Sequence, residues 1–433
     1  MSGIAEVLLT LGYKVSGSDL KESDVTAHLK KLGAKVSIGH KAENIEGVDV
    51  VVTSTAVAQD NPEVVAARKN KIPVIPRVEM LAELARMKYA VTIAGTHGKT
   101  TTTSLTSLVL AKGGLDPTVV IGGRLKNLKS GAKLGKGEYL VAEADESDGS
   151  FLKLSPTIAV VTNIDNDHLD YYGTIENIKQ AFVKHINSVP FYGCSIVCSD
   201  DGNVREIMPQ IKRRCLTYGL KNTPDYAAKD IKPVDFGCEF DAYNNGKKLG
   251  RIRLNVPGIH NVLNSLAAIA VGMELGVSFK DISSALNDYA GVGRRLEIKG
   301  DKNGILVIDD YGHHPAEIRV TLEAIKSNWP GRRLVTLFQP HRYTRTQSLC
   351  KEFGDALKLS DDVKLLEIYS AGEKPIEGVS NKLIFENMKD KGARVEYFQD
   401  VDRLVSQLKA GDIVLTLGAG DIWKIGEEIL KKI

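Results

Sequence analysis

The chain has 433 residues, of which 43% are hydrophobic and 26% are charged. This length exceeds one compact core and predicts two to four domains of ordinary globular composition. A net charge of +3 is too small to indicate a nucleic-acid-binding surface, and no apolar run approaches the roughly 18–20 residues of a membrane span. Met1–Glu6 lacks the basic segment of a signal peptide. The five scattered cysteines form no Cys-x-x-Cys pair, which predicts reduced thiols in a cytoplasmic protein.

Residues 1–86 alternate short predicted helices and strands. A helix is expected over Ile4–Leu11 and a strand over Lys14–Asp19. The apolar run Val48–Val52 predicts a buried parallel strand, which the polar segment 53–56 follows. This pattern is typical of a nucleotide-binding α/β domain.

A second region, residues 87–291, begins with the apolar strand Tyr89–Ala94, which runs directly into a Gly-rich loop and a helix. Two further strands are predicted at Tyr139–Ala142 and Thr157–Val161. Short strands are expected over 194–256, with a hairpin turn at Asn244–Gly246. A long apolar helix is expected over Gly258–Gly276.

The third region, residues 292–433, again alternates apolar strands with helical segments. The strands are expected at Ile305–Ile308, Leu334–Phe338, Val363–Ile368 and Ile413–Leu417. This alternation predicts a second doubly wound sheet. The whole chain is therefore expected to be an α/β protein of three domains.

The strongest local signal is the loop between a predicted strand and a predicted helix, Gly95-Thr96-His97-Gly98-Lys99-Thr100. Glycines let backbone N–H groups close on phosphate oxygens, and the helix start adds its dipole. Lys99 would neutralise the terminal phosphates, and Thr100 would offer its hydroxyl to Mg²⁺. Ile93 stands where the full phosphate-loop pattern has its first glycine. The alternative is a Gly-rich turn with an exposed lysine, but the flanking strand and helix favour a phosphate site.

Four acidic residues follow a predicted strand within Glu143–Asp148. Beside a phosphate loop, they suit a hard cation that bridges phosphates. For Asp145, Glu146 and Asp148 individually, a solvated acidic loop is the better interpretation. Glu143 differs because it extends the apolar strand, so we expect it to face a ligand.

Three further polar side chains stand at element starts or ends. His168 follows an apolar strand within Asn163–Asp170, where a neutral histidine beside acids can hold a second metal. A hydrogen-bonded loop histidine is the commoner arrangement. His260 and Asn264 share one face of the predicted long helix. They suit an adenine edge, or equally a helix cap and a buried polar contact.

Histidines and arginines gather in three segments of the third region: Gly293–Arg295, Asp309–Pro315 and Gln339–Thr346. The last two follow strands, where doubly wound sheets bind ligands. Two arginines near a histidine suit a carboxylate or phosphate ligand. For any single arginine, a solvated basic loop is the alternative.

Together these segments resemble the Mur ligase family along the whole chain, from Met1–Glu6 to Gly418–Ile422. The specific markers are Gly95–Thr101, Glu143–Asp148, Asp310–Pro315 and Gln339–Arg345. The last of these markers points, within the family, to the member that adds alanine.

The resemblance implies a Rossmann-like N-terminal domain that lacks its first strand, a central P-loop ATPase-type mononucleotide-binding domain, and a C-terminal Rossmann-like domain. The first domain would bind a UDP-sugar, the second ATP and the third an amino acid. The implied reaction joins L-alanine to the lactyl carboxylate of UDP-N-acetylmuramate through an acyl phosphate, in peptidoglycan biosynthesis. ATP and Mg²⁺ are the implied cofactors. Neither nucleic acid nor membrane is an implied partner, and a monomer or weak homodimer is expected.

The resemblance also implies roles for individual residues. The catalytic set would be Lys99, Glu143, His168, His313 (near the acyl phosphate) and Arg345. ATP would contact Gly95, Thr96, His97, Gly98, Lys99, Thr100, Thr101, His260, Asn264 and Arg295, with its ribose on Asp309 or Asp310. Mg²⁺ would be held by Thr100, Glu143 and His168. The UDP-sugar would meet Ser54 and Thr55, and L-alanine would meet Tyr311, His341, Arg342 and Arg345.

The sequence departs from the family pattern at two places. The family has an apolar strand and a Gly-rich turn before the segment that begins here at Met1. We therefore expect a loosened first domain that binds the UDP-sugar weakly, as a misassigned start or a truncated reading frame would produce. Asn166 stands where a proline is usual, and little is expected from this change.

Three other functions fit part of the pattern. A ligase of the same superfamily for a recycled peptide or another amino acid would differ only in the third-domain loop. A non-catalytic binder of UDP-sugar or ATP is disfavoured by intact Lys99, Thr100, Glu143 and His168. A P-loop ATPase coupled to motion fits less well than a synthesis from two substrates, because α/β domains with polar strand-end loops flank the phosphate loop.

Overall fold

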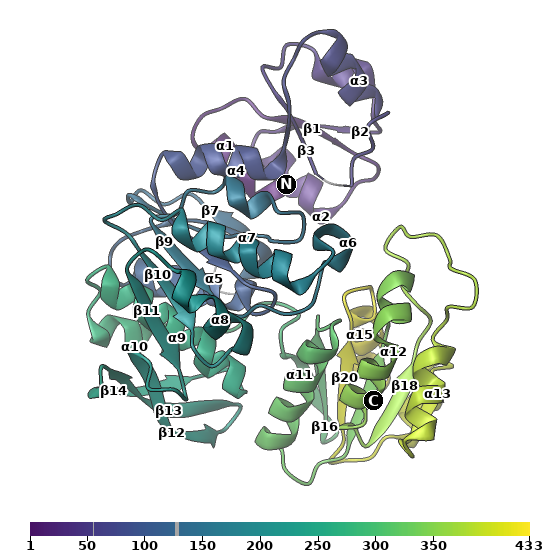
Figure 1. Cartoon of the computed structure of the whole chain (residues 1–433). Coiled ribbons are helices and arrows are strands. Elements are labelled where there is room, and N and C mark those ends of the chain that lie inside the picture. The colour runs from purple at the N-terminus through teal and green to yellow at the C-terminus, as the bar shows by residue number, and fades with distance from the viewer. Residues whose placement is uncertain (55, 126–129) are drawn as a thin grey trace. The chain divides into compact units, whose positions relative to one another are not determined.

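The computed structural model describes residues 1–54, 56–125 and 130–433 (Figure 1). The described residues form two compact units. One unit holds residues 1–229, 241–252 and 263–289, and the other holds residues 230–240, 253–262 and 290–433. None of the described helices is both long enough and apolar enough to cross a membrane.

Residues 1–86 form short helices and strands in alternation. The helices are α1 (Ser2–Thr10), α2 (Asp24–Lys31), α3 (Pro62–Lys69) and α4 (Arg77–Arg86), and the strands are β1 (Ser16–Asp19), β2 (Lys35–Ile38), β3 (Val51–Thr53) and β4 (Val74–Pro76). β1 pairs in parallel with β2, and β3 pairs in parallel with β4. The prediction of a buried strand over Val48–Val52 is wrong in extent and burial, because β3 is shorter and only half-buried. A two-stranded sheet cannot cover the faces of its strands.

The central sheet has the strand order β14-β13-β12-β11-β10-β9-β5-β8-β6-β7. Its strands are β5 (Tyr89–Ala94), β6 (Thr118–Leu125), β7 (Ser130–Lys133), β8 (Tyr139–Glu143), β9 (Ile158–Val161), β10 (Cys194–Cys198), β11 (Cys215–Gly219), β12 (Tyr226–Val234), β13 (Gly237–Asn244) and β14 (Lys247–Leu254). The helices of this region are α5 (Lys99–Lys112), α6 (Leu169–Tyr172), α7 (Ile175–Asn187), α8 (Gly202–Ile207), α9 (Ile259–Glu274) and α10 (Phe279–Asn287). The predicted hairpin turn is confirmed, with positive φ at Asn245 and Gly246.

β5 lies between β8 and β9 and runs parallel to both. The register sets Ile93 opposite Glu143 and Ala94 opposite Val161. Because parallel strands end at the same sheet edge, the loops that follow these three strands lie together. The predicted order of strand, Gly-rich loop and helix is confirmed here.

The C-terminal sheet has the order β15-β16-β20-β17-β18-β19 and is parallel except for the edge strand β15. Its strands are β15 (Glu297–Lys302), β16 (Ile305–Asp310), β17 (Leu334–Phe338), β18 (Asp362–Leu365), β19 (Val395–Tyr397) and β20 (Ile413–Leu417), and its helices are α11 (Pro315–Asn328), α12 (Tyr343–Leu357), α13 (Lys382–Asp390), α14 (Val401–Gln407) and α15 (Trp423–Lys432). The strand expected at Val363–Ile368 ends at Leu365, because the chain after it pairs with the loop after β17 through a bridge of Tyr369 to His341.

Candidate active site

Two glycines shape the loop that follows β5. Gly95 and Gly98 have φ of 135° and 83°, which residues with a Cβ rarely adopt. A Cβ on Gly95 would lie 2.0 Å from Thr162 Oγ1, and one on Gly98 would lie 2.8 Å from Asn264 Oδ1. The loop is therefore packed closely, and it leads into α5, whose N-cap residue Gly98 offers no capping side chain. The N–H groups of such a first turn are the groups that bind phosphate.

The loop after β9 holds the phosphate loop in place. Asn163 Oδ1 accepts a hydrogen bond from the His97 N–H at 2.8 Å, and its amide donates to His97 O at 3.0 Å. Thr162 Oγ1 donates to the same carbonyl at 2.6 Å, and Thr96 Oγ1 accepts from the Asp165 N–H at 2.8 Å. The sequence analysis predicted no role for Thr162 or Asn163. Their position directly after an apolar strand is the feature that could have indicated one.

The side chain of Lys99 points toward the phosphate loop and Glu146. Its ammonium donates to Gly95 O at 2.6 Å, to Thr96 O at 3.2 Å and to both carboxylate oxygens of Glu146 at 2.9 Å. Burial lowers the pKa of Lys99, but the nearby carboxylates, Glu146 first and then Asp145, outweigh burial and raise it overall. Glu146 is 2% exposed. The interpretation of Glu146 as a solvated acid is therefore wrong, because the loop turns this carboxylate inward onto the lysine.

The predicted metal ligands Glu143 and His168 lie at the same sheet edge. Glu143 ends β8 opposite Ile93, and its charge contributes to the raised pKa of Lys99. His168 directly precedes α6 with a φ of 57°, and its Nε2 lies 3.9 Å from Glu146 Oε1. The structure therefore brings the lysine, the carboxylates and the imidazole together.

Asn264 of α9 lies against the phosphate loop. It is 7% exposed and accepts a hydrogen bond from Thr102 Oγ1 at 3.1 Å. Its side chain also faces the Cβ position of Gly98. The predicted ATP-binding amide thus stands beside the first turn of α5, which carries Thr100 and Thr101.

Polar residues of the N-terminal region also gather at strand ends. Ser54 follows β3 and is half-buried, whereas Thr55 lies outside the described residues. Ser18 Oγ lies 2.9 Å from His40 Nδ1 and donates to Glu63 Oε2 at 2.7 Å. This group could not be found from the sequence, because its members come from three separate segments.

Asp309 and Asp310 end β16 and are both buried. Asp309 accepts a hydrogen bond from Thr416 Oγ1 at 2.7 Å and pairs with Arg294 at 3.1 Å. Asp310 accepts from the Leu296 N–H at 2.7 Å, and burial raises its pKa to about 6. These carboxylates bind groups of their own domain, and their contact with ribose stays a prediction.

Arg294 joins the start of the C-terminal sheet region to the loop after β20. Its guanidinium donates to Gly418 O at 2.6 Å and to the next two carbonyls at 3.4 and 3.0 Å. The Cζ atoms of Arg294 and Arg295 lie 5.0 and 5.3 Å from the ring centre of Tyr311. Burial lowers the pKa of His260 to about 4, and the positive charge of Arg295 is a second, smaller cause. Arg295 and His260, both predicted to meet ATP, are therefore close enough to interact.

The side chains predicted to face the amino acid lie together with His313, which was predicted to lie near the acyl phosphate. The rings of Tyr311 and His313 are 5.4 Å apart, and those of His313 and His341 are 5.6 Å apart. Arg345 Nη1 lies 3.4 Å from His341 Nδ1, and Arg342 is the N-cap of α12. Burial lowers the pKa of both histidines to about 4. Both imidazoles are therefore neutral at pH 7.

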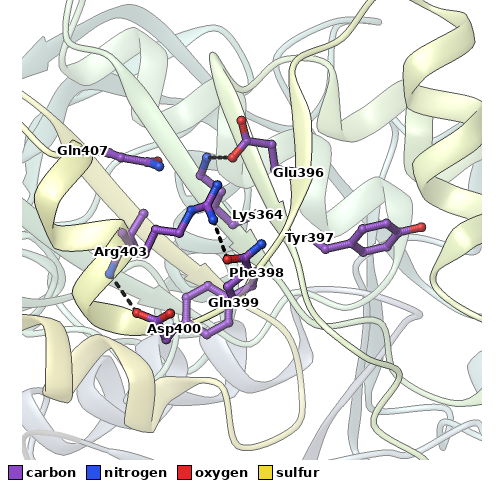
Figure 2. A pocket seen from close by; sticks show the side chains of 9 residues that line it. Lys364, Glu396, Tyr397, Phe398, Gln399, Asp400, Arg403 and Gln407 are labelled. Atoms are coloured by element: carbon purple, nitrogen blue, oxygen red, sulfur yellow. Dashed lines mark hydrogen bonds and ion pairs between the residues drawn. The ribbon is translucent and has the colours of Figure 1, made fainter.

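A small hollow of about 20 Å³ is a separate feature of the C-terminal unit (Figure 2). It is lined by Lys364, Glu396, Tyr397, Phe398, Gln399, Asp400, Arg403, Leu404 and Gln407. Lys364 donates to Glu396 at 2.9 Å, and Arg403 donates to Gln399 at 2.6 Å. Its cationic side chains are engaged within the protein, and its volume suits about one water molecule. None of the predicted site residues lines it.

Comparison with known families covers almost the whole chain. Residues 1–89 match the Mur ligase family catalytic domain, residues 93–272 match the Mur ligase middle domain, and residues 294–420 match the Mur ligase glutamate ligase domain.

Relatives and a solved structure extend this likeness. The UDP-N-acetylmuramate–L-alanine ligase of Endomicrobium trichonymphae is 63% identical over 430 residues, which cover 99% of this chain and 96% of that protein. The protein of the same name from Trichlorobacter lovleyi is 58% identical, with 100% and 96% covered. The crystal structure of the UDP-N-acetylmuramate–alanine ligase from Thermotoga maritima has a TM-score of 0.84 and 31% identity, with 100% and 96% covered. This chain therefore belongs to the Mur ligase family and has its three-domain α/β fold.

Proposed function

We propose that this protein joins L-alanine to the lactyl carboxylate of UDP-N-acetylmuramate in peptidoglycan synthesis. Mur ligases are ATP-dependent. The observation that carries the proposal is the meeting of Lys99, Glu143 and His168 beside a tightly packed phosphate loop. The full-length relatives that bear this ligase name support the choice of substrates. Residues 1–86, 87–291 and 292–433 would bind the UDP-sugar, ATP and the amino acid, and these boundaries stay predictions.

The chemistry follows from the weakness of a carboxylate as an electrophile. Transfer of the terminal phosphoryl group of ATP to the lactyl carboxylate gives an acyl phosphate and ADP, which removes the carboxylate charge and supplies a leaving group. The amine of L-alanine then attacks the carbonyl carbon, and the tetrahedral adduct collapses to the amide and phosphate. Lys99 would exchange Glu146 for oxygens of the transferring phosphoryl group and stabilise their charge.

The donor set at this edge fits Mg²⁺. Thr100 offers a hydroxyl and Glu143 a carboxylate, the oxygen ligands that hard cations prefer when they bridge phosphates, and His168 adds an imidazole nitrogen. When bound, the ion would neutralise phosphate charge and orient the oxygens. The protein would hold Glu143 and His168 beside the first turn of α5, which carries Thr100.

The cluster of Tyr311, His313, His341, Arg342 and Arg345 offers groups that can bind an amino acid. Arg342 and Arg345 are cations for its carboxylate, which arginine binds with two parallel hydrogen bonds. Neutral His313 and His341 add no positive charge beside its ammonium group, which must lose a proton to the solvent before it attacks. The Tyr311 ring lies beside that of His313.

The test measures ADP release from ATP with UDP-N-acetylmuramate and a panel of L-alanine, glycine, L-serine and a short peptide. ADP release should require the UDP-sugar, and L-alanine should give the highest kcat/KM. Fast ATP hydrolysis without either substrate would refute a ligase. A preference for the peptide would identify a ligase of the same family with another substrate.

A further inference from the structure

A tight turn in the C-terminal unit, the 369–373 turn, follows β18 and contacts the loop after β17. Ala371 and Gly372 have φ of 50° and 88°, and the Glu373 N–H donates to Ser370 O at 3.0 Å. Two central residues with positive φ reverse the chain sharply. The two ends of the turn thereby reach the loop after β17 and the start of α12, which follows that loop.

Tyr369, at the first end, holds that loop by its backbone and its ring. The Tyr369 N–H donates to Pro340 O at 2.8 Å, and Tyr369 O accepts from the Arg342 N–H at 2.9 Å. These bonds frame a parallel bridge to His341. The rings of Tyr369 and His341 are stacked, with centres 5.7 Å apart and planes 9° apart. The Tyr369 ring therefore restricts the orientation of the imidazole from one face.

Glu373, at the other end, caps α12 from outside the helix. Arg342, the N-cap residue, has a φ of 72° and supplies no capping side chain, and this backbone conformation is costly for a residue with a Cβ. Glu373 accepts from Thr344 N–H at 3.1 Å and from Thr344 Oγ1 at 2.7 Å. A carboxylate is also favourable at the positive end of a helix. Glu373 therefore stabilises a strained helix start that carries Arg342 and, within the first turn, Arg345.

We propose that Tyr369 and Glu373 are positioning residues for the amino-acid substrate, which hold His341, Arg342 and Arg345 in the geometry that binds its carboxylate. The inference rests on the proposed function, and neither positioning residue needs to touch the substrate. Their contacts, described above, lie within the C-terminal unit. Loss of either should weaken amino-acid binding and leave use of ATP unchanged.

The experiment compares KM values for L-alanine and ATP in the full chain. Glu373→Ala should raise the KM for L-alanine about tenfold, equivalent to about 1.4 kcal/mol, and leave the KM for ATP within about twofold. Glu373→Gln keeps an oxygen that accepts from Thr344 and should recover most of the loss. Tyr369→Leu should resemble Glu373→Ala, whereas Tyr369→Phe keeps the stacked ring and should stay near wild type. Glu377→Ala, at an exposed site in the same segment, is the matched control.

Two outcomes would overturn the inference. One is an unchanged KM for L-alanine in both Glu373→Ala and Tyr369→Leu. The other is an equal rise in both KM values, since this result would mean general damage to the domain. Absence of alanine-dependent turnover in the wild type would instead refute the proposed function, so the two failures are distinguishable.

Discussion

Lys99 and Glu146 form an ion pair that water reaches poorly, with side chains 17% and 2% exposed. Breaking a buried pair by removing one partner costs about 3–5 kcal/mol, whereas replacing both partners is often neutral. Removing Lys99 alone therefore destabilises the fold by leaving Glu146 without its cation, while the proposed phosphoryl transfer needs Lys99 itself. These two contributions can be separated by substituting one residue and then both.

We expect Lys99→Met to abolish ADP formation and to lower the free energy of unfolding by about 3 kcal/mol, because Glu146 loses its cation. The double variant Lys99→Met with Glu146→Gln should recover most of the stability and remain inactive. Thermal unfolding and ADP release, measured on the same samples, check both statements. An active double variant would show that Lys99 does not bind the transferring phosphoryl group.

The sequence predicted Lys99, Glu143 and His168 at this edge because each directly follows an apolar strand or its loop. The buried position of the Glu146 carboxylate could not be predicted, for a physical reason. Its inward direction depends on a turn in which the Gly149 N–H donates to Glu146 O at 3.0 Å, and on Tyr172, whose hydroxyl donates to the same carbonyl at 2.6 Å. Such contacts from another helix leave no trace in a local pattern of acidic residues.

At the scale of elements, α7 carries a buried histidine against the central sheet. His185 is 1% exposed, and its Nε2 lies 3.1 Å from Thr92 Oγ1 of β5. Burial lowers its pKa from 6.5 to about 4. As pH falls, the unfolded chain therefore binds this proton first. The stability from the neutral imidazole is fully present above pH 6.5 and is lost as pH falls from 6.5 to about 4.

Substitution of His185 should make folding less sensitive to acid. Between pH 7 and pH 5 the wild type should lose about 2 kcal/mol more of its free energy of unfolding than His185→Gln. Urea unfolding at the two pH values measures this difference. His28→Gln, at a side chain that is 49% exposed, serves as control. An acid sensitivity of His185→Gln equal to that of wild type would assign the effect to other groups.

Elements with mostly apolar runs were the ones that could be predicted from the sequence. β5, β9, β17 and β20 match their expected positions because both faces of these strands are covered. Val48–Val52 is also mostly apolar, apart from Asp49, yet β3 has only one partner strand and stays half-buried. The apolar pattern specifies the strand, but the number of neighbouring strands decides its burial.

At the scale of the whole molecule, nucleotide binding should be visible as a gain in stability. A ligand that binds only the folded protein at about 100 times its Kd adds about 2.7 kcal/mol to the free energy of unfolding. Saturating ADP with Mg²⁺ should therefore raise the unfolding temperature of the wild type and of Glu377→Ala, and should have little effect on the Lys99→Met and Glu146→Gln double variant. Calorimetric scans with and without ADP provide the measurement. The same shift in all three proteins would place the nucleotide away from Lys99.

The three α/β regions could be predicted from the alternation of strands and helices. The order of the ten-stranded sheet could not, because β5 pairs with β8 and β9 across long stretches of chain. The contacts of Asp310 with Leu296 and Thr321 are likewise set only by the folded sheet. Residue identity indicated the chemistry, and the long-range pairing decided which groups meet.

The hydrogen bonds of Arg294 have a mechanical consequence. The chain enters the C-terminal sheet through β15, an antiparallel edge strand, and a pull on such a strand would peel it away one hydrogen bond at a time. Arg294 lies just before β15 and donates hydrogen bonds to the backbone carbonyls that follow β20. β20 lies between β16 and β17 in the sheet. Tension on the preceding segment would therefore act through Arg294 on the loop that follows an inner strand, as well as on the edge strand β15.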